Sequence, residues 1–174
     1  MTNVQIYVGT YNKYNNGSIY GEWLDLSNYS DIQELHAEMR KIHKDEEDPE
    51  FMFQDYECPD FFQKLNLISE CHISENIFEV IEIIENCSYV IEVIEAYCNC
   101  IYPNNETIEE IIEKIEESYN GEYQNDIEFV QEQLESCGDI PQNLPSYIHI
   151  DWERTAYDIM MDYSTSENHY FRNL

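Results

Sequence analysis

The spacing of apolar residues has a period of two in the first part of the chain. Residues 4–8, 19–26 and 51–55 alternate apolar and polar positions and are rich in β-branched and aromatic residues, as half-buried strands are. The turn-forming residues 15–18 separate the first two runs, which predicts an antiparallel hairpin with a long loop. The three runs predict a small antiparallel sheet within residues 1–60.

One helix is expected between the second and third strands. Apolar residues recur three and four apart over residues 31–43, and Ser30 with Gln33 has the spacing of a capping box. Pro49 and the acidic residues before it end this helix. The sheet and the helix make an α+β unit, and we expect Trp23 in its core.

From about residue 60 the apolar period becomes that of helices. We predict helices over residues 74–86, 89–99, 107–119, 126–136 and 151–163, a short extended piece at 147–150 and a closing strand at 170–171. Ser74, the pair Asn104-Asn105 with Thr107, and Gly138 supply the expected helix ends. The fold class is therefore α+β with a helical middle region, and we expect Trp152 in the core of the last part.

Acidic residues dominate the charge of the chain. Its 174 residues include 37 Asp and Glu against 8 Lys and Arg, which gives a formal net charge of −29. Such a charge constrains the partners of a protein rather than its fold. It repels nucleic acid and anionic membranes, so we expect neither as a partner and predict a basic protein surface instead.

The acidic residues are arranged in stripes along the predicted helices. Residues three and four apart share one helix face, with Cβ atoms about 5–6 Å apart. The apolar residues of each helix fall on the opposite face. The residues that we expect to form the acidic surface are Glu75, Glu79, Glu82, Glu92, Glu95, Glu109, Glu110, Glu113, Glu116, Glu117, Glu128, Glu132 and Glu135.

These stripes lack the opposite charges that helices normally carry. Lys114 is the only Lys or Arg between Lys64 and Arg154, although like charges at i,i+4 cost a few tenths of a kcal/mol per pair. One hypothesis is that the carboxylates match the phosphates of DNA. Duplex DNA carries one charge per roughly 1.7 Å of axis, so the net charge of this chain corresponds to about 50 Å of duplex, or roughly 15 base pairs.

Three other interpretations of the acidic residues are open. A Glu-rich helix face is commonly just a solvated face. Halophilic adaptation also makes proteins acidic, but it favours Asp with small apolar residues, whereas this chain is rich in Ile, Asn, Tyr and Glu. The cluster at residues 45–48 suggests calcium, yet it lacks the alternating ligands and central Gly of an EF-hand loop. We therefore expect no metal site.

The sequence offers no catalytic residues. Its five glycines form no phosphate-binding loop, and its five histidines form no H-E-x-x-H pattern. Carboxylate pairs occur throughout a chain with this many acids, so they identify no hydrolase. We expect a protein that is not an enzyme and uses no cofactor.

No segment is expected to direct the chain out of the cytoplasm. The first residues lack the basic and apolar regions of a signal peptide. The most apolar stretch, residues 77–102, carries a Glu every third or fourth residue and so cannot cross a bilayer. The six cysteines form no C-x-x-C pair, so we expect reduced, mostly buried thiols in a cytoplasmic protein.

Four blocks of the sequence resemble the ArdA family of antirestriction proteins. They are residues 6–26, with IYVGTY, KYNNGS and WLDL; residues 45–56, DEEDPEFMFQDY; residues 119–129, with YNGEY and IEF; and residues 150–172, with IDWERTA, MMDY and YFR. The third block resembles the antirestriction segment of the family. We expect its site residues to be Tyr119, Gly121, Tyr123 and Phe129.

The resemblance implies an elongated homodimer of three small domains per chain. These would be an N-terminal α+β domain (1–60), an acidic helical bundle (61–103), and a C-terminal mixed α/β domain (104–174) with the antirestriction-like segment and the dimer contacts. It further implies that carboxylates replace DNA phosphates and bind the methyltransferase core of type I restriction-modification enzymes, inhibiting restriction and often modification. Val130 and Tyr157 depart from the family pattern, which commonly has Ala and a basic residue at these positions.

A protein that binds a restriction enzyme in place of DNA is a DNA decoy, and two alternatives to this function remain. An acidic adaptor would bind another basic protein, such as a histone-like protein or a DNA-binding regulator, and would leave restriction enzymes untouched. A hydrolase among the carboxylates would lose its activity with one or two acids, whereas a decoy would weaken gradually.

Overall fold

Three antiparallel strands open the fold, as the alternating pattern predicts. In the computed structural model, which describes residues 2–103, 105–141 and 143–174, β1 (Gln5–Thr10) lies between β2 (Glu22–Asp25) and β3 (Phe51–Glu57). Strand β1 pairs antiparallel with both neighbours, and the register of the β1–β3 pair shifts between Tyr7 and Val8. The hairpin and the third strand are thus confirmed, although β2 is shorter than the predicted run.

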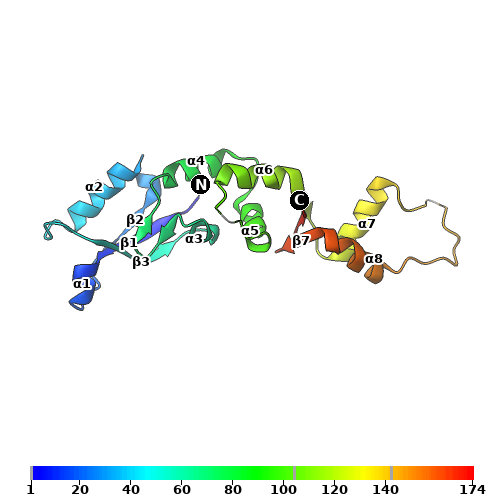
Figure 1. Ribbon diagram of the computed structural model, residues 1–174, viewed down its shortest axis with the longest axis horizontal. Helices are drawn as coiled ribbons and strands as arrows, with labels where there is room; N and C mark the ends of the chain where they lie inside the picture. Colours follow the sequence, from blue (N-terminus) through cyan, green and yellow to red (C-terminus); the bar gives the residue numbers. More distant parts are fainter. Residues whose placement is uncertain (1, 104, 142) are drawn as a thin grey trace.

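Helix α2 (Ile32–Ile42) lies over this sheet (Figure 1) and confirms the predicted helix, but its cap differs. The N-cap is Asp31, whose carboxylate accepts the backbone N–H of Glu34, while the Glu34 carboxylate accepts that of Ser30. The capping box predicted from Ser30 and Gln33 is therefore wrong. A carboxylate accepts stronger hydrogen bonds than a hydroxyl and suits the positive end of the helix dipole.

Two short helices in this region are missing from the sequence-based prediction. Helix α1 (Tyr11–Asn15) follows β1 directly, and its N-cap Thr10 accepts the backbone N–H of Lys13. The 3-10 helix η1 (Leu26–Asn28) follows β2. Each is a single turn or little more, too short to give an apolar periodicity.

The middle of the chain is helical, with one small hairpin that the apolar pattern does not predict. Its elements in order are α3 (Phe61–Lys64), β4 (Ile68–Ser69), β5 (His72–Ile73), α4 (Ile77–Asn86), α5 (Ile91–Cys100) and α6 (Ile108–Ser118). Helix α6 packs against both α4 and α5. It begins at a complete capping box between Thr107 and Glu110. Asn104 of the predicted cap lies outside the described residues.

The predicted start of α4 is wrong. The helix begins at Ile77, and Ser74 does not cap it, because the Ser74 hydroxyl donates to the side chain of Asn76 instead. Glu75 therefore precedes the helix and does not belong to its periodic stripe.

The C-terminal region combines two helices with a three-stranded sheet. Its elements in order are β6 (Tyr119–Glu122), α7 (Asp126–Cys137), α8 (Trp152–Ile159), the 3-10 helix η2 (Met160–Asp162), β7 (Tyr163–Ser166) and β8 (His169–Arg172). Strand β8 lies between β6 and β7 and is antiparallel to both. The predicted helix over 126–136 and the closing strand are confirmed. The last helix ends earlier than predicted, and residues 147–150 form no strand.

The buried apolar side chains form two clusters that meet at β8. The larger cluster runs from Val4 in the first sheet through α4, α5 and α6 to Phe171. The smaller one joins Phe129 and Val130 of α7 to Ala156 of α8 and to Tyr170. Because the side chains of successive strand residues point to opposite faces, Tyr170 belongs to the smaller cluster and Phe171 to the larger one.

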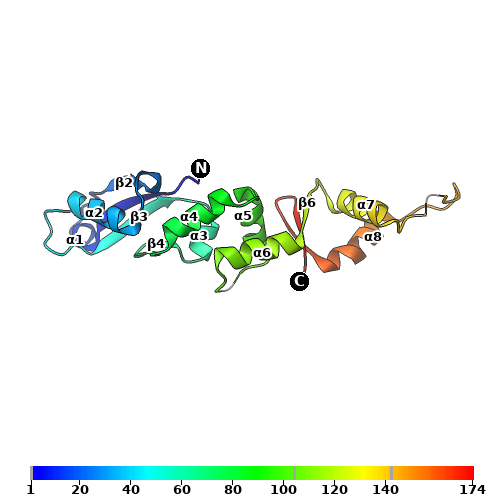
Figure 2. The same cartoon turned by 90° about the horizontal axis from the view of Figure 1, so that it is seen from above.

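The elements follow one another along an elongated body. Figures 1 and 2 show the first sheet at one end, α4 to α6 in the centre, and α7 and α8 at the other end. The α+β class, the helical middle and the C-terminal mixed unit are thus confirmed, whereas the domain boundaries at residues 60 and 103 remain predictions. No helix among the described residues is long and apolar enough to cross a membrane.

Two expectations about burial need correction. Trp23 is 43% exposed on the edge strand β2, where it packs edge-on against Tyr7, and Trp152 is only half-buried. All six cysteines are free, but Cys98 alone is buried, and Cys71 and Cys137 are exposed. These two lie in the β4–β5 turn and at the last residue of α7, where no apolar layer covers them.

Candidate functional site

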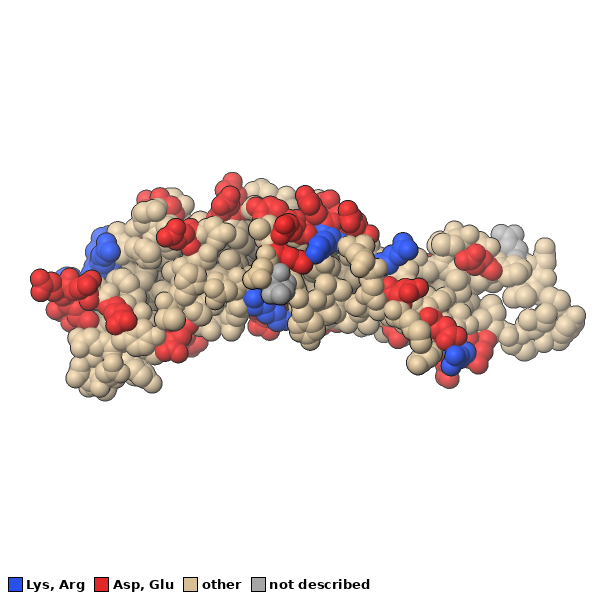
Figure 3. All heavy atoms as spheres, viewed as in Figure 1, with Lys and Arg blue, Asp and Glu red and all other residues tan. Residues whose placement is uncertain are grey.

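The predicted acidic surface is exposed on the helices that carry it. Every residue of the predicted set is exposed except Glu95, which is half-buried. The isoleucines on the opposite face of α6, such as Ile111 and Ile115, are buried in the larger core. Figure 3 shows carboxylates gathered along the upper face of the molecule, over the region of α4 and α6. Core packing therefore turns the Glu residues of these helices outward.

Three of the predicted carboxylates have backbone partners at helix starts. Glu95 accepts the N–H of Asp60 at 2.7 Å, which ties α5 to the start of α3. Glu110 accepts the N–H of Thr107 at 2.9 Å, and Glu128 accepts the N–H of Gln124 at 3.1 Å. These side chains stabilise the fold as well as adding negative charge.

The one basic residue within the acidic region is already paired. Lys114 donates to Glu106 at 2.7 Å. The Glu106 side chain is largely covered and does not belong to the predicted acidic set. Among the ion pairs of the described ranges 2–103, 105–141 and 143–174, none involves a residue of the predicted acidic set. The stripes thus present their charge to solvent.

Two adjoining hollows lie between α4 and α6, share Ile83 and Glu109, and are together called the α4–α6 groove; carboxylates of both helices border them. Glu79 and Glu82 line the groove from α4, and Glu109 and Glu113 from α6. The half-buried side chain of Ile83 lines both hollows, and Ile112 lines the one that also holds Glu82 and Glu113. Stripes that are separate in the sequence therefore face each other across an apolar strip.

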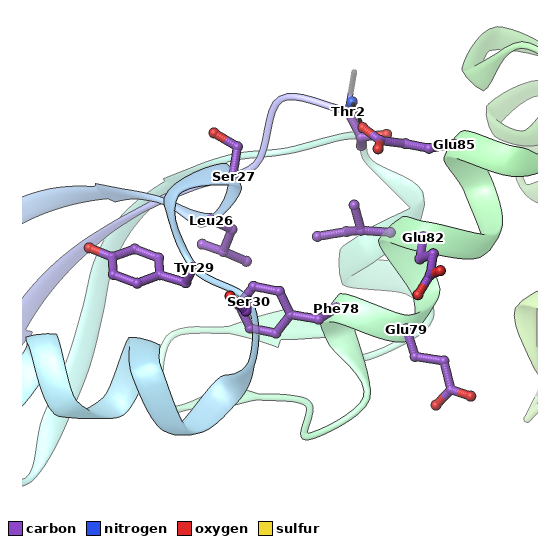
Figure 4. Close-up of a pocket in the computed structure, with 10 residues that line it drawn as sticks. Thr2, Leu26, Ser27, Tyr29, Ser30, Phe78, Glu79, Glu82 and Glu85 are labelled. Atoms are coloured by element: carbon purple, nitrogen blue, oxygen red, sulfur yellow. Dashed lines mark hydrogen bonds between the residues drawn. The ribbon is translucent and has the colours of Figure 1, made fainter.

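A second hollow lies on the other side of α4 (Figure 4). Leu26, Tyr29 and Phe78 line it, and Glu79, Glu82 and Glu85 follow its α4 side. Glu85 turns toward Thr2 and accepts its backbone N–H at 2.8 Å. This residue is not in the predicted acidic set. Glu79 points away from Tyr29 in this view. The Glu85 carboxylate therefore anchors the start of the chain to α4.

The acidic cluster at residues 45–48 belongs to a polar network at the end of the molecule. Lys13 donates to Asp45 at 2.8 Å and lies 3.5 Å from a carboxylate oxygen of Glu46. It also lies 3.0 Å from Nδ1 of His43, whose Nε2 is 3.1 Å from the Val8 carbonyl oxygen. Because a carbonyl oxygen only accepts and an ammonium only donates, Nε2 of the buried His43 donates to the carbonyl and Nδ1 accepts from the ammonium.

This network changes the titration of Asp45. The hydrogen bond from Lys13 holds the pKa of the Asp45 carboxyl below its usual range. Two of the four acids of the cluster thus have a structural partner, whereas Glu79, Glu82, Glu109 and Glu113 at the α4–α6 groove form no ion pair among the described residues.

The antirestriction-like segment packs aromatic rings at the junction of the two cores. Tyr119 is half-buried, and its hydroxyl lies 2.9 Å from Nδ1 of His169. Tyr123 packs edge-on against Phe129 at 5.1 Å between ring centroids, and Phe129 stacks on Tyr170 at 4.5 Å. Burial, reinforced by the Glu132 carboxylate, raises the pKa of the Tyr123 hydroxyl.

Gly121 has a backbone conformation that favours glycine over any other residue. Its φ of +113° is in the region that side chains rarely adopt, and a Cβ would lie 3.2 Å from the Tyr123 ring. The register of the β6–β8 pair shifts between Tyr119 and this glycine. Tyr123 and Phe129 thus join the smaller core next to Gly121, whereas Tyr119 packs against the larger core, and these three aromatic side chains hold β6 and α7 against β8 from its two faces.

Comparison with known proteins finds a family match along nearly the whole chain. No match is found among curated proteins. The family model described as "Antirestriction protein (ArdA)" matches residues 6–172 and so covers both the acidic helices and the aromatic junction. This family is one of antirestriction proteins and not of catalysts. The chain belongs to the ArdA family of antirestriction proteins.

Proposed function

We propose that this protein inhibits type I restriction-modification enzymes by occupying their DNA-binding groove as a decoy. The observation that carries the proposal is the exposed set of carboxylates on α4, α6 and α7, within which the one basic side chain, Lys114, is paired with Glu106. Like charges at this spacing cost each helix stability. Binding of these carboxylates to a basic partner surface would account for a charge pattern that lowers the stability of the helices.

The shape of the molecule supports a partner that normally holds DNA. Helices α4, α6 and α7 lie one after another along the elongated body (Figures 1 and 2). Carboxylates about 5–6 Å apart on each helix give a charge density of the same order as that of duplex DNA. The proposed contact is the methyltransferase core of the enzyme, so we expect inhibition of modification as well as of restriction.

A competition experiment tests the proposal. Labelled DNA bound to a purified type I methyltransferase should be displaced by the protein in a gel shift, and endonuclease activity should fall in parallel. An acidic adaptor for another basic protein would leave both unchanged, which would overturn the proposal.

The salt dependence of this complex is a second test. Affinity should fall steeply as salt rises, because opposed charges are screened within about 10 Å at 0.1 M. The slope should be gentler than that of DNA, since a folded protein lacks the condensed counterion layer of the duplex. An affinity that does not change with salt would exclude carboxylates as the recognised groups.

We propose further that the working form is a homodimer formed through the C-terminal region. Large apolar side chains are exposed there, on the loop between α7 and α8 and on α8 and η2: Leu144, Tyr147, Ile148, Tyr157 and Met161. Exposed apolar patches mark association surfaces. Light scattering coupled to gel filtration should give twice the chain mass, and Tyr147→Ser with Tyr157→Ser should reduce it. A wild-type monomer at micromolar concentration would contradict this part of the proposal.

A further inference from the structure

We infer that the face of the N-terminal sheet that turns away from α2 is a contact surface for arginine side chains of the basic partner. On this face the guanidinium group of an arginine stacks on the rings of Trp23 and Tyr7. The identity of the partner rests on the proposed function, whereas the chemistry of the face does not.

The strand register places six side chains on this face. Val8 and Leu24 are buried on the α2 side of the sheet, and successive strand residues point to opposite sides. Tyr7 on β1 therefore points away from α2, as do the residues opposite it on β2 and β3 and the next such row. We call these six residues the open face: Gln5, Tyr7, Trp23, Asp25, Asp55 and Glu57.

The aromatic pair is the unusual part of the open face. Trp23 is 43% exposed, and its ring centroid lies 5.5 Å from that of Tyr7 at an interplanar angle of 65°. An edge-on pair of this kind leaves ring surface available to a third group. Aromatic residues are enriched where one protein contacts another. The pair therefore offers stacking surface that the fold itself does not use.

Basic side chains of the chain already lie over two other exposed aromatic rings. Nζ of Lys13 is 4.8 Å from the centroid of the Tyr20 ring, and Cζ of Arg154 is 5.2 Å from that of the Tyr157 ring. Within the described ranges 2–103, 105–141 and 143–174, no basic side chain lies over Trp23 in this way. Since indole is the aromatic ring that attracts cations most strongly, this position is available to a cation of the partner.

The charge of the open face indicates a basic occupant. Three of its six residues are acids and none is basic. Oδ1 of Asp25 accepts the N–H of Ser27, and Oδ1 of Asp55 accepts the N–H of Tyr56, so both carboxylates are held at the sheet. Neither forms an ion pair within the described part of the chain. A cation stacked on the rings would gain from these carboxylates, whereas a second copy of this acidic chain would be repelled.

Arginine suits this face better than lysine. A guanidinium group is planar and weakly hydrated, so it can stack on a ring while its N–H groups donate to carboxylates at its edge. An ammonium group is compact and strongly hydrated and has no flat surface to stack. A preference for arginine over lysine at equal charge therefore distinguishes the ring contact from diffuse attraction to an acidic protein.

The test is an NMR titration of the full-length protein labelled with nitrogen-15. The chain has two tryptophans, so its indole N–H groups give two signals, which Trp152→Phe assigns. The probes are the amides of tri-arginine and tri-lysine, which carry the same charge, at equal ionic strength. Tri-arginine should shift the Trp23 signal in a saturable way and bind at least about threefold more tightly than tri-lysine, because only the guanidinium stacks.

Trp152 is the internal control. It is half-buried on α8 and lies between Asp151 and Glu153, so diffuse attraction of a peptide to acids would reach it as well. Its shift should be less than about a third of the Trp23 shift, since a contact with the ring itself has the larger effect. Equal shifts of the two signals, or equal affinities of the two peptides at Trp23, would overturn the inference.

Two tyrosine variants of the N-terminal unit sharpen the test. Tyr7 belongs to the open face, whereas Tyr14 is exposed on α1. Tyr7→Leu should remove most of the preference for tri-arginine, and Tyr14→Leu should keep it. If both variants keep the full preference, Tyr7 does not take part in the contact and the inference is wrong.

Charge variants keep the inference testable if Tyr7→Leu does not fold. Asp25→Asn with Asp55→Asn should weaken tri-arginine binding at Trp23 more than about fivefold, since each lost contact is worth up to about 1 kcal/mol. The matched pair Glu47→Gln with Asp48→Asn changes net charge equally away from the open face and should weaken binding less than about twofold. Equal losses would indicate diffuse attraction and contradict a defined site.

Two further outcomes separate this inference from self-association and from the proposed function. Trp23→Ser should leave the mass measured by light scattering unchanged. A lower mass would make the open face a contact between copies of the chain and overturn the inference. Because the titration contains no restriction enzyme, peptide binding at Trp23 without inhibition by the wild-type protein would overturn only the proposed function.

Discussion

The two ends of the larger core use their acidic residues differently. In the N-terminal unit, Asp45 and Glu46 surround the largely buried ammonium of Lys13, and Glu38 pairs with Lys41. On α4 and α6 the carboxylates that border the groove face solvent, and the single base of this stretch is held by Glu106. Acids of the first kind stabilise the fold, whereas acids of the second kind that lie four residues apart, such as Glu109 and Glu113, repel each other along their helix.

This difference separates charge that supports the structure from charge that is available to a partner. Among the eight Lys and Arg of the chain, four lie before residue 45, where they stand against only five Asp and Glu. Among the described residues, exposed carboxylates without an ion pair occur in both regions, since Glu47, Asp48 and Glu50 of the N-terminal unit are exposed and unpaired. On α4, α6 and α7, however, the carboxylates lie in stripes on one helix face, which is what a directional contact with a basic surface requires.

The largest effect is expected from neutralising one stripe. The triple change Glu109→Gln, Glu113→Gln and Glu116→Gln should weaken inhibition about 100-fold, since three contacts of about 1 kcal/mol each are lost. The melting temperature should not fall, because like-charge repulsion along α6 is removed. Gel-shift competition and thermal unfolding of the same samples measure both.

The matched control for the stripe lies in the N-terminal unit. Changing the exposed residues Glu47, Asp48 and Glu50 to their amides alters net charge equally but leaves the acidic helices intact. Inhibition should change less than tenfold, which is about 1.4 kcal/mol. Equal losses in the two triple variants would mean that only total charge matters and would remove the distinction between the regions.

The N-terminal network should affect stability and not inhibition. Lys13→Met leaves Asp45 and Nδ1 of His43 without the ammonium donor, and Glu46 keeps only the Thr10 hydroxyl, so the free energy of unfolding should fall by about 1–3 kcal/mol. Lys41→Met breaks an exposed pair and should cost less than about 1 kcal/mol. Urea unfolding compares the two variants. A loss of inhibition by Lys13→Met at unchanged stability would place this network in the partner contact instead.

The stability of the protein at alkaline pH tests the burial of three titratable side chains in the larger core. Burial raises the pKa of Cys58 to about 11, and the pKa values of Tyr97 and Cys98 to about 12. A pKa that is higher in the folded chain gives a stability contribution that is complete below the unfolded value and is lost as pH rises toward the folded value.

The free energy of unfolding should therefore begin to fall near pH 9, the ordinary pKa of a thiol, and fall further above pH 10, that of a tyrosine. Urea unfolding between about pH 8 and pH 11 measures the slope, which is at most about 1.4 kcal/mol per pH unit for each group. Cys98→Ala should reduce the slope, and exposed Cys137→Ala should not. Stability that rises over this range would contradict the burial of these groups.

The smallest effect is expected from a single carboxylate. Glu113→Gln should weaken inhibition less than tenfold, because each contact of a distributed charge surface is worth about 0–1 kcal/mol. It should also stabilise the fold by a few tenths of a kcal/mol, since Glu109 and Glu117 lie four residues away on the same helix. Should one single carboxylate prove indispensable while the fold stays intact, a true active site must be sought there.

Local sequence determined the helices and their outward faces. Isoleucine and glutamate at helical spacing place α4, α6 and α7 and turn their carboxylates to solvent, since only the apolar face can join a core. The capping box at Thr107 and the left-handed Gly138 after α7 mark helix ends with chemistry that acts within one turn. The exposure of these carboxylates could therefore be predicted from local sequence, whereas their role in binding a partner stays a prediction.

Tertiary structure decided how these pieces meet. Strand β6 is too short to show a pattern and exists because β8 pairs with it from nearly fifty residues away. The hairpin β7–β8 turns on Glu167 and Asn168, both at positive φ, which a Glu does not signal in advance. The alignment of α4 with α6, which brings Glu82 and Glu113 to one groove over Ile83, depends on packing between helices. Contacts of that kind are set by the shape of the shared core and not by the spacing of residues along either helix.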